Sequence, residues 1–334
     1  MGFNLKDVMK TAAAPFSCLA EIKAEIAEFA KREDLNGFQK WIASERYVFE
    51  PELDFEPKSV IAAAVPFEEY HLIFMHGGKK IKSVSDHIPV SENDVIAALG
   101  GGSGGDTSEN DGGGENSSGG DTSENDGVGD IGENGGGGKY HFFFDYWLPQ
   151  KRFAVRSGLA EYGKNNICFV DGMGSLLTLF CFISDMPCPD NYIWREVANM
   201  PECEGCDLCI NNCPTGAIKK DRFLIDNSQC LSAMNEFGTD PFPDSVPFTA
   251  HHRAVHCSRC QYVCPKNAGF FGNAVKTFEF DESETALLLS GKKMEELPSP
   301  LSDKIKDCGM DWYYASLPRN LAALFASGNN VIAG

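Results

Sequence analysis

The sequence predicts an α/β protein with a cysteine-rich module in its second half. Three observations support this. Apolar residues recur at helical spacing over 19–32, and apolar runs at 59–66 and 175–183 have the length of buried strands. Eight of the thirteen cysteines fall between residues 203 and 264. With 334 residues, 43% of them apolar, the chain is long enough to bury one or two cores.

The N-terminal part contributes the first helix and the first strand. The helix over 19–32 is amphipathic, because its apolar residues share one face: Leu19, Ile22, Ile26 and Phe29. The run from Ser59 to Pro66 is short, apolar and ended by proline, which indicates a buried strand. Both patterns are first of all packing signals and assign no chemistry.

Regular structure resumes after residue 140. A helix is expected over 150–157, ending near Gly158. Strands are expected over 166–170 and 175–183, with the glycine-rich segment 171–174 as the turn between them. The cysteine-rich block follows, and two or three helices complete the chain, with Leu287–Leu289 and Leu321–Phe325 as apolar anchors.

Residues 100–138 interrupt the folded pattern. They hold 17 of the 34 glycines and nine carboxylates with no Lys or Arg, and Gly-Gly-Asp-Thr-Ser-Glu-Asn-Asp occurs there twice. Burying the few apolar side chains of this segment would not offset the entropy lost on ordering its backbone. The sequence therefore predicts a flexible acidic loop. A calcium loop is the alternative, but the spacing of ligands and the closing Glu are missing. The rest of the chain still carries ten of the 19 net negative charges.

The first residues and the absence of a long apolar run predict a cytoplasmic protein. Met1-Gly-Phe-Asn-Leu-Lys lacks the pattern of a secretory signal, and no stretch approaches the roughly 20 apolar residues that span a bilayer. Thiols stay reduced in the cytosol, so clustered cysteines favour metal over disulfides.

Two cysteine motifs carry the main functional prediction. The first is Cys203-x2-Cys206-x2-Cys209-x3-Cys213-Pro, and the second is Cys257-x2-Cys260-x3-Cys264-Pro. In such runs three closely spaced thiolates bind one [4Fe-4S] cluster, and the cysteine before proline reaches a different cluster. The second motif is one cysteine short, and Cys230 between the motifs is the natural replacement.

This logic predicts a crossed assignment of eight ligands. Cluster 1 takes Cys203, Cys206, Cys209 and Cys264, and cluster 2 takes Cys213, Cys230, Cys257 and Cys260. A structural zinc site is the alternative, but zinc prefers isolated Cys-x2-Cys pairs. His256 is expected beside the ligands rather than among them. Cys168 and Cys181 lie in apolar runs, which suggests core residues.

The order of features resembles the epoxyqueuosine reductase family, relatives of the reductive dehalogenases. Besides the cysteine block, the matching stretches are Lys58–Ile61, Arg156–Lys164, Gly174-Ser175, Ser184–Pro187 and Pro318–Leu321. The resemblance implies a nitroreductase-like α/β cobalamin-binding domain over 1–190, which includes the loop 100–138. This domain is followed by a ferredoxin-like double [4Fe-4S] domain over 191–275. A helical tail over 276–334 then packs on the core. Electrons would pass through the clusters to cobalamin, which reduces the substrate.

The resemblance also implies candidate site residues. The family's proton donor lies just upstream of the helix that leads into the Gly-Leu stretch. Asp145 is the nearest candidate, and Tyr140 and Tyr146 are alternatives. Arg156 and Lys164 are candidate cofactor-binding residues. For the family's Asp-Tyr-His stretch the sequence offers only Asp86-His87 and Tyr140-His141, and neither is a clean match.

Partners and substrate follow from the same resemblance. The electron donor is expected to be a low-potential protein such as ferredoxin or flavodoxin. A modified nucleoside in tRNA and a small molecule both stay open as substrates, because tRNA binding needs a basic face and the chain is acidic. The alternative function, from another class, is a cobalamin-free ferredoxin-like protein that feeds electrons to a partner enzyme. A third reading places a flavin, in place of cobalamin, in the nitroreductase-like pocket.

Overall fold

The computed structural model describes residues 4–100, 138–142 and 148–332. Almost all of the predicted acidic loop, and the candidates Asp145 and Tyr146, lie outside these residues. The chain forms two compact units that interleave along the sequence. Unit 1 contains 1–65, 90–159 and 179–196, and unit 2 contains 66–89, 160–178 and 197–334.

Unit 1 is built on a four-stranded sheet of order β1-β2-β8-β5. The strands are β1 (Lys10–Pro15), β2 (Ser59–Pro66), β8 (Leu177–Ser184) and β5 (Tyr140–Phe142). Strand β2 matches the predicted strand, and its residues 60 and 62–65 are fully buried. The core on this sheet includes Val65 and Phe182, packed with Val95 and Ile96 of helix α4 (Glu92–Ala98).

The remaining helices of unit 1 are α1 (Leu5–Val8), α2 (Leu19–Ala30), α3 (Gly37–Trp41) and α5 (Gln150–Arg156). Helix α2 confirms the amphipathic helix expected over 19–32, and α5 confirms the one over 150–157. The two helices contact each other through Arg152, whose Nε lies 2.6 Å from a carboxylate oxygen of Glu25.

Unit 2 contains a three-stranded sheet of order β4-β3-β9. Strands β3 (Glu68–His76) and β4 (Lys79–His87) form an antiparallel hairpin, and β9 (Lys276–Phe280) pairs parallel to β3. The hairpin turn is Gly77-Gly78, and both residues have positive φ (58° and 71°). Glycine adopts this left-handed conformation without a steric cost, so the turn matches the twist of the strands.

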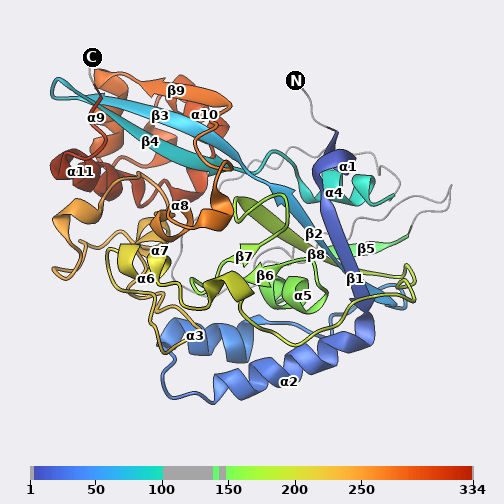
Figure 1. The fold of residues 1–334 in the computed structure, drawn as a ribbon. Helices are drawn as coiled ribbons and strands as arrows, with labels where there is room; N and C mark the ends of the chain where they lie inside the picture. The colour runs from blue at the N-terminus through green and yellow to red at the C-terminus, as the bar shows by residue number, and fades with distance from the viewer. Residues whose placement is uncertain (1–3, 101–137, 143–147, 333–334) are drawn as a thin grey trace. The chain divides into compact units, whose positions relative to one another are not determined.

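The C-terminal helices pack on this sheet. Helices α9 (Glu282–Leu289), α10 (Ser299–Asp307) and α11 (Leu317–Ser327) lie beside it in Figure 1. They share one core with the sheet, which includes Phe74, Phe280, Leu288 and Leu321, each fully buried. The expected helices and their apolar anchors are thereby confirmed.

The expected arrangement of the strands around 171–174 is wrong in one respect. The turn forms, because the Val170 N–H donates to the Gly174 carbonyl (2.9 Å). However, β7 (Cys168–Phe169) pairs with β6 (Glu161–Tyr162), whereas β8 pairs with β2 and β5. Directly after the turn, the Ser175 N–H donates to the side chain of Asn267 (2.8 Å), and the chain continues into β8. Within the described ranges, no helix has the length and apolar character needed to cross a bilayer.

Candidate metal centre

Short helices and tight turns of unit 2 carry the eight predicted cysteine ligands. In the first motif, Cys203 ends a 3-10 turn, Cys209 lies in α6 (Leu208–Asn212) and Cys213 follows that helix. In the second motif, Cys260 lies in α8 (Arg259–Tyr262). Cys230 precedes α7 (Leu231–Phe237). All eight cysteines carry free thiols.

One cavity brings together four cysteines from both motifs. It has a volume of about 180 Å³, and its lining includes Cys203, Cys206, Cys209 and Cys264. These are the four residues assigned to cluster 1. Among the described residues, no three His, Cys, Asp or Glu side chains gather tightly enough to hold a single metal ion. The four cysteines thus line one cavity without forming a site for a single ion.

The other four cysteines interact with one another. The pKa of Cys260 is raised by burial first and then by the neighbouring Cys257, Cys230 and Cys213. Burial likewise raises the pKa of Cys257 to about 11, with Cys230 and Cys213 contributing. A thiol must lose its proton to bind iron, so metal loading here has to displace protons that burial retains.

Backbone N–H groups point at two of the sulfurs. The Lys164 N–H donates to Cys203 Sγ (3.3 Å), and the Ala217 N–H donates to Cys213 Sγ (3.2 Å). Hydrogen bonds to ligand sulfurs are one of the means by which a protein sets the potential of an iron-sulfur cluster. Lys164, the last residue of the stretch Arg156–Lys164 that resembles the family, thus lines the cavity.

The backbone around Cys257 is held in an unusual conformation. His256 and Ser258, which flank it, have φ values of 57° and 58°. For residues other than glycine this left-handed region costs on the order of 1–3 kcal/mol each, and it persists only where surrounding contacts hold it. The conformation of the loop around Cys257 is therefore maintained by contacts with the surrounding residues and is not the one that the backbone prefers.

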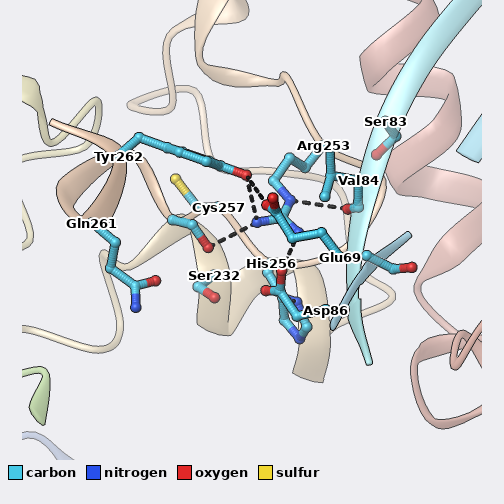
Figure 2. Close-up of polar contacts among 12 residues, drawn as sticks. Glu69, Ser83, Val84, Asp86, Ser232, Arg253, His256, Cys257, Gln261 and Tyr262 are labelled. Carbon is cyan, nitrogen blue, oxygen red and sulfur yellow. Dashed lines mark hydrogen bonds and ion pairs between the residues drawn. The ribbon is translucent and has the colours of Figure 1, made fainter. Parts of the chain in front are cut away.

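A buried polar network holds this loop. Figure 2 shows Tyr262, Val84 and Asp86 converging on the guanidinium of Arg253. Arg253 donates to Asp86 (2.9 Å) and to the Val84 carbonyl (3.0 Å), and its Nη1 donates to Ser258 Oγ (2.9 Å). The contacts join strand β4 to the second cysteine motif.

Opposite charges face each other in this network. Burial alone would raise the pKa of Asp86, but Arg253 and His256 outweigh it and hold the pKa well below its ordinary value. Asp86 therefore stays ionised beside the buried guanidinium. The His256 ring nitrogens lie 3.2 Å from Asp86 and 3.9 Å from Glu236. These contacts suit the expected place of His256 beside the ligands, which stays a prediction.

Sequence patterns did not predict Arg253 as part of the site, and they pointed to Asp86 only through the incomplete match Asp86-His87. The two residues lie 167 positions apart, so no local spacing relates them. Asn267 was missed as well, although it lies three residues after Cys264. Its side chain donates to Ser175 Oγ (2.8 Å) and to the Gln261 carbonyl (2.9 Å), which anchors the end of the second motif.

The candidate Arg156 lies in unit 1 and is only 3% exposed. Its guanidinium pairs with Glu21 and lies 2.9 Å from Glu25. It also stacks over the Trp194 ring, 4.7 Å from the centroid. These partners brace α5 on α2, and a cofactor-binding role for Arg156 stays a prediction.

Of the three candidate proton donors, only Tyr140 lies within the described residues. It is 4% exposed, and its hydroxyl donates to the Leu99 carbonyl (3.4 Å). Burial, with a smaller contribution from the Asp185 charge, raises its pKa. The phenol is therefore protonated at neutral pH, and a proton-donating role for Tyr140 stays a prediction.

Comparison with known proteins agrees with this geometry. The family model of the 4Fe-4S double cluster binding domain matches residues 202–267, a range that contains all eight cysteines. The chain carries this domain, and its cofactors include two [4Fe-4S] clusters.

Similarity to solved structures extends over nearly the whole chain. The structure of epoxyqueuosine reductase from Streptococcus thermophilus matches with a TM-score of 0.52 and 16% identity, covering 95% of this chain and 77% of that one. A crystal structure of epoxyqueuosine reductase with a tRNA-Tyr epoxyqueuosine-modified stem loop matches with a TM-score of 0.55, at 18% identity and the same coverage. This chain has the fold of epoxyqueuosine reductases.

Curated relatives are also epoxyqueuosine reductases, with shorter matches. The protein from Cyclobacterium marinum is 32% identical over 120 residues, which cover 36% of this chain and 37% of the relative. The one from Cellulophaga algicola is 28% identical over 194 residues, covering 58% of this chain and 60% of the relative. The chain thus spans from about a third to three fifths of these two relatives. The predicted resemblance to the epoxyqueuosine reductases is confirmed.

Proposed function

We propose that this chain is a reductase of the epoxyqueuosine reductase type, which passes electrons through two [4Fe-4S] clusters to a bound cobalamin. The observation that carries the proposal is the cavity lined by Cys203, Cys206, Cys209 and Cys264. Three of these thiols come from the first motif and the fourth from the second. A shared cavity of four thiols is what a crossed pair of cluster motifs requires.

The donor set fits the clusters. Cluster 1 would be held by the four cysteines of the cavity. Cluster 2 would be held by the mutually interacting cysteines Cys213, Cys230, Cys257 and Cys260. Thiolate sulfur is the ligand that iron-sulfur clusters use, and no ligand is left over or missing. When bound, the clusters supply one-electron transfer.

The chain's own residues hold and shield this centre. The N–H groups of Lys164 and Ala217 donate to ligand sulfurs, and Arg253 fixes the loop around Cys257. Cys257 is buried, so water has little access to this member of the second set. The protein thus positions the cofactors and leaves the electron chemistry to them.

The finer parts of the proposal rest on the family resemblance. The N-terminal domain over 1–190 would have the nitroreductase-like arrangement and bind cobalamin, with Arg156 and Lys164 as candidate contacts. The domain over 191–275 would hold the clusters, and the tail over 276–334 would cover the core. Tyr140, Asp145 and Tyr146 are the candidate proton donors. A low-potential ferredoxin or flavodoxin in the cytoplasm would supply the electrons.

The substrate we propose is a modified nucleoside. The relative solved with an epoxyqueuosine-modified stem loop of tRNA supports this class. The net charge of −19 speaks against a broad contact with the phosphate backbone. A small molecule that is not part of a tRNA is the second candidate substrate.

Anaerobic purification with cobalamin tests the proposal. We expect about eight iron atoms per chain and corrinoid absorption bands that survive desalting. The purified protein is then given an epoxyqueuosine-containing stem loop or the free nucleoside, with reduced flavodoxin as donor. Zinc in place of iron would overturn the proposal. Iron-sulfur absorption without retained corrinoid would replace it with the alternative, a ferredoxin-like electron-transfer protein.

A further inference from the structure

Two lysines share one carboxylate at the edge of the cluster 1 cavity. Lys164 Nζ lies 2.9 Å from Asp207 Oδ1, and Lys220 Nζ lies 3.0 Å from Asp207 Oδ2. Asp207 itself follows the ligand Cys206. Two ammonium groups and one carboxylate leave this group of three with one net positive charge beside the predicted ligands.

The two lysines differ in how they reach the cavity. Lys164 lines it, and its ammonium also donates to the Cys206 carbonyl. Its side chain is 20% exposed, whereas that of Lys220 is 79% exposed. Water screens an exposed charge far more than a half-buried one. The charge of Lys164 is therefore the one that acts on the cavity.

Both ends of Lys164 lie against the loop that carries the predicted ligands. Its backbone N–H donates to Cys203 Sγ (3.3 Å), and its ammonium donates to the carbonyl of Cys206. A positive charge held there stabilises negative charge on the sulfurs and on whatever they bind.

We propose that Lys164 sets the reduction potential of cluster 1, by placing its ammonium against the Cys203–Cys209 loop. The inference rests on the proposed function, since it requires a cluster there. Reduction adds one electron and therefore one negative charge, with no bond formed or broken. An adjacent cation favours the reduced state, so Lys164 raises the potential.

The test is a redox titration of the iron-loaded full-length chain, followed by electron paramagnetic resonance. Lys164→Met removes the ammonium but keeps the backbone N–H that donates to Cys203. We expect one of the two reduction waves to move to more negative potential, with a change of about tenfold in its equilibrium, or about 59 mV for one electron. Lys164→Arg should restore most of the shift, because it restores the charge.

Two further variants separate charge from structure. Lys220→Met is the matched control, because Lys220 pairs with the same carboxylate from solvent, and it should leave both waves in place. Asp207→Asn removes the negative charge and should move the same wave the opposite way, to more positive potential. A purely structural role for Lys164 would move neither wave in these directions.

The outcomes distinguish this inference from the proposed function. Wild-type protein without iron would overturn the proposed function and the inference together. Two clusters with waves that are unchanged in Lys164→Met would overturn the inference alone. If Lys164→Met fails to retain iron, Lys164→Gln, which removes the charge but keeps a polar side chain, is titrated in its place, and an unchanged wave there refutes the inference.

Discussion

The guanidinium of Arg253 lies 2.9 Å from the carboxylate of Asp86, with the two side chains 2% and 10% exposed. This buried pair connects strand β4 to the loop that precedes Cys257, as Figure 2 shows. It links a hairpin near the start of unit 2 to the predicted ligands of cluster 2. The stability of the loop thus depends on a residue far from it in sequence.

Asp86→Ala should destabilise the protein by about 3–5 kcal/mol, because it leaves the buried charge of Arg253 unpaired. Urea unfolding under anaerobic conditions measures the change, and iron analysis shows whether cluster 2 is kept. Asp54→Ala is the control, since Asp54 pairs with Lys139 at the surface (54% and 41% exposed) and should change stability little. Equal losses in both variants would contradict a special role for the buried pair.

Cys230→Ala should lower the iron content from about eight to about four atoms per chain, because it removes a ligand of cluster 2 alone. Cys181→Ala is the matched control. Cys181 is a buried core residue of β8, outside the predicted ligand set, so its removal should leave the iron content unchanged. Iron and sulfide analysis gives the readout. A Cys230→Ala protein that keeps all its iron would refute the crossed assignment.

Cys308 should resist alkylation near neutral pH. It is fully buried, and burial raises the pKa of its thiol from 9.0 to about 12. The thiolate is the reactive form, so at pH 8 its population falls by about 1,000-fold and then rises about tenfold per pH unit. Peptide mapping after a pulse of iodoacetamide measures this, with the half-buried Cys188 as the comparison. Similar labelling of the two at pH 8 would contradict the prediction.

Leu321→Ala should cost about 2–5 kcal/mol, because Leu321 is fully buried in the core shared by α11 and the sheet of unit 2. Val275→Ala is the control, since Val275 is 61% exposed and its truncation should change stability by less than about 0.5 kcal/mol. Thermal or urea unfolding measures both. An unaffected Leu321→Ala protein would mean that the core does not form as described.

Local patterns in the sequence were enough for many elements of the fold. The apolar run ended by Pro66 gave a strand with the right bounds, and the helical spacing of Leu19 and Ile22 gave α2. The cysteine spacing likewise predicted which four thiols share a cavity, because ligand geometry constrains spacing directly. These features depend on neighbours in the chain.

The remaining features were not predicted, for two different reasons. The hairpin around Gly77-Gly78 was missed although it had a local signal, since two glycines between alternating apolar residues are typical of a tight turn. The other features depend on distant partners. By contrast, the turn at 171–174 suggested a hairpin, but β8 pairs with β2 and β5, whereas β7 pairs with β6. Nothing near Arg253 in sequence indicates that Asp86 will be its partner. Such choices are made by the tertiary fold.

The parallel pairing of β3 with β9 also bears on how the protein is made. Tyr70 of β3 lies opposite Lys276 of β9. During synthesis the β3–β4 hairpin is therefore made about 200 residues before the strand with which it pairs. Asp86, which pairs with Arg253 near Cys257, belongs to that hairpin. The sheet that supports this pair is therefore incomplete until residues 276–280 have been synthesised. Nascent chains stalled before residue 276 are therefore expected to be cut by protease within 68–87, whereas released full-length chains resist it.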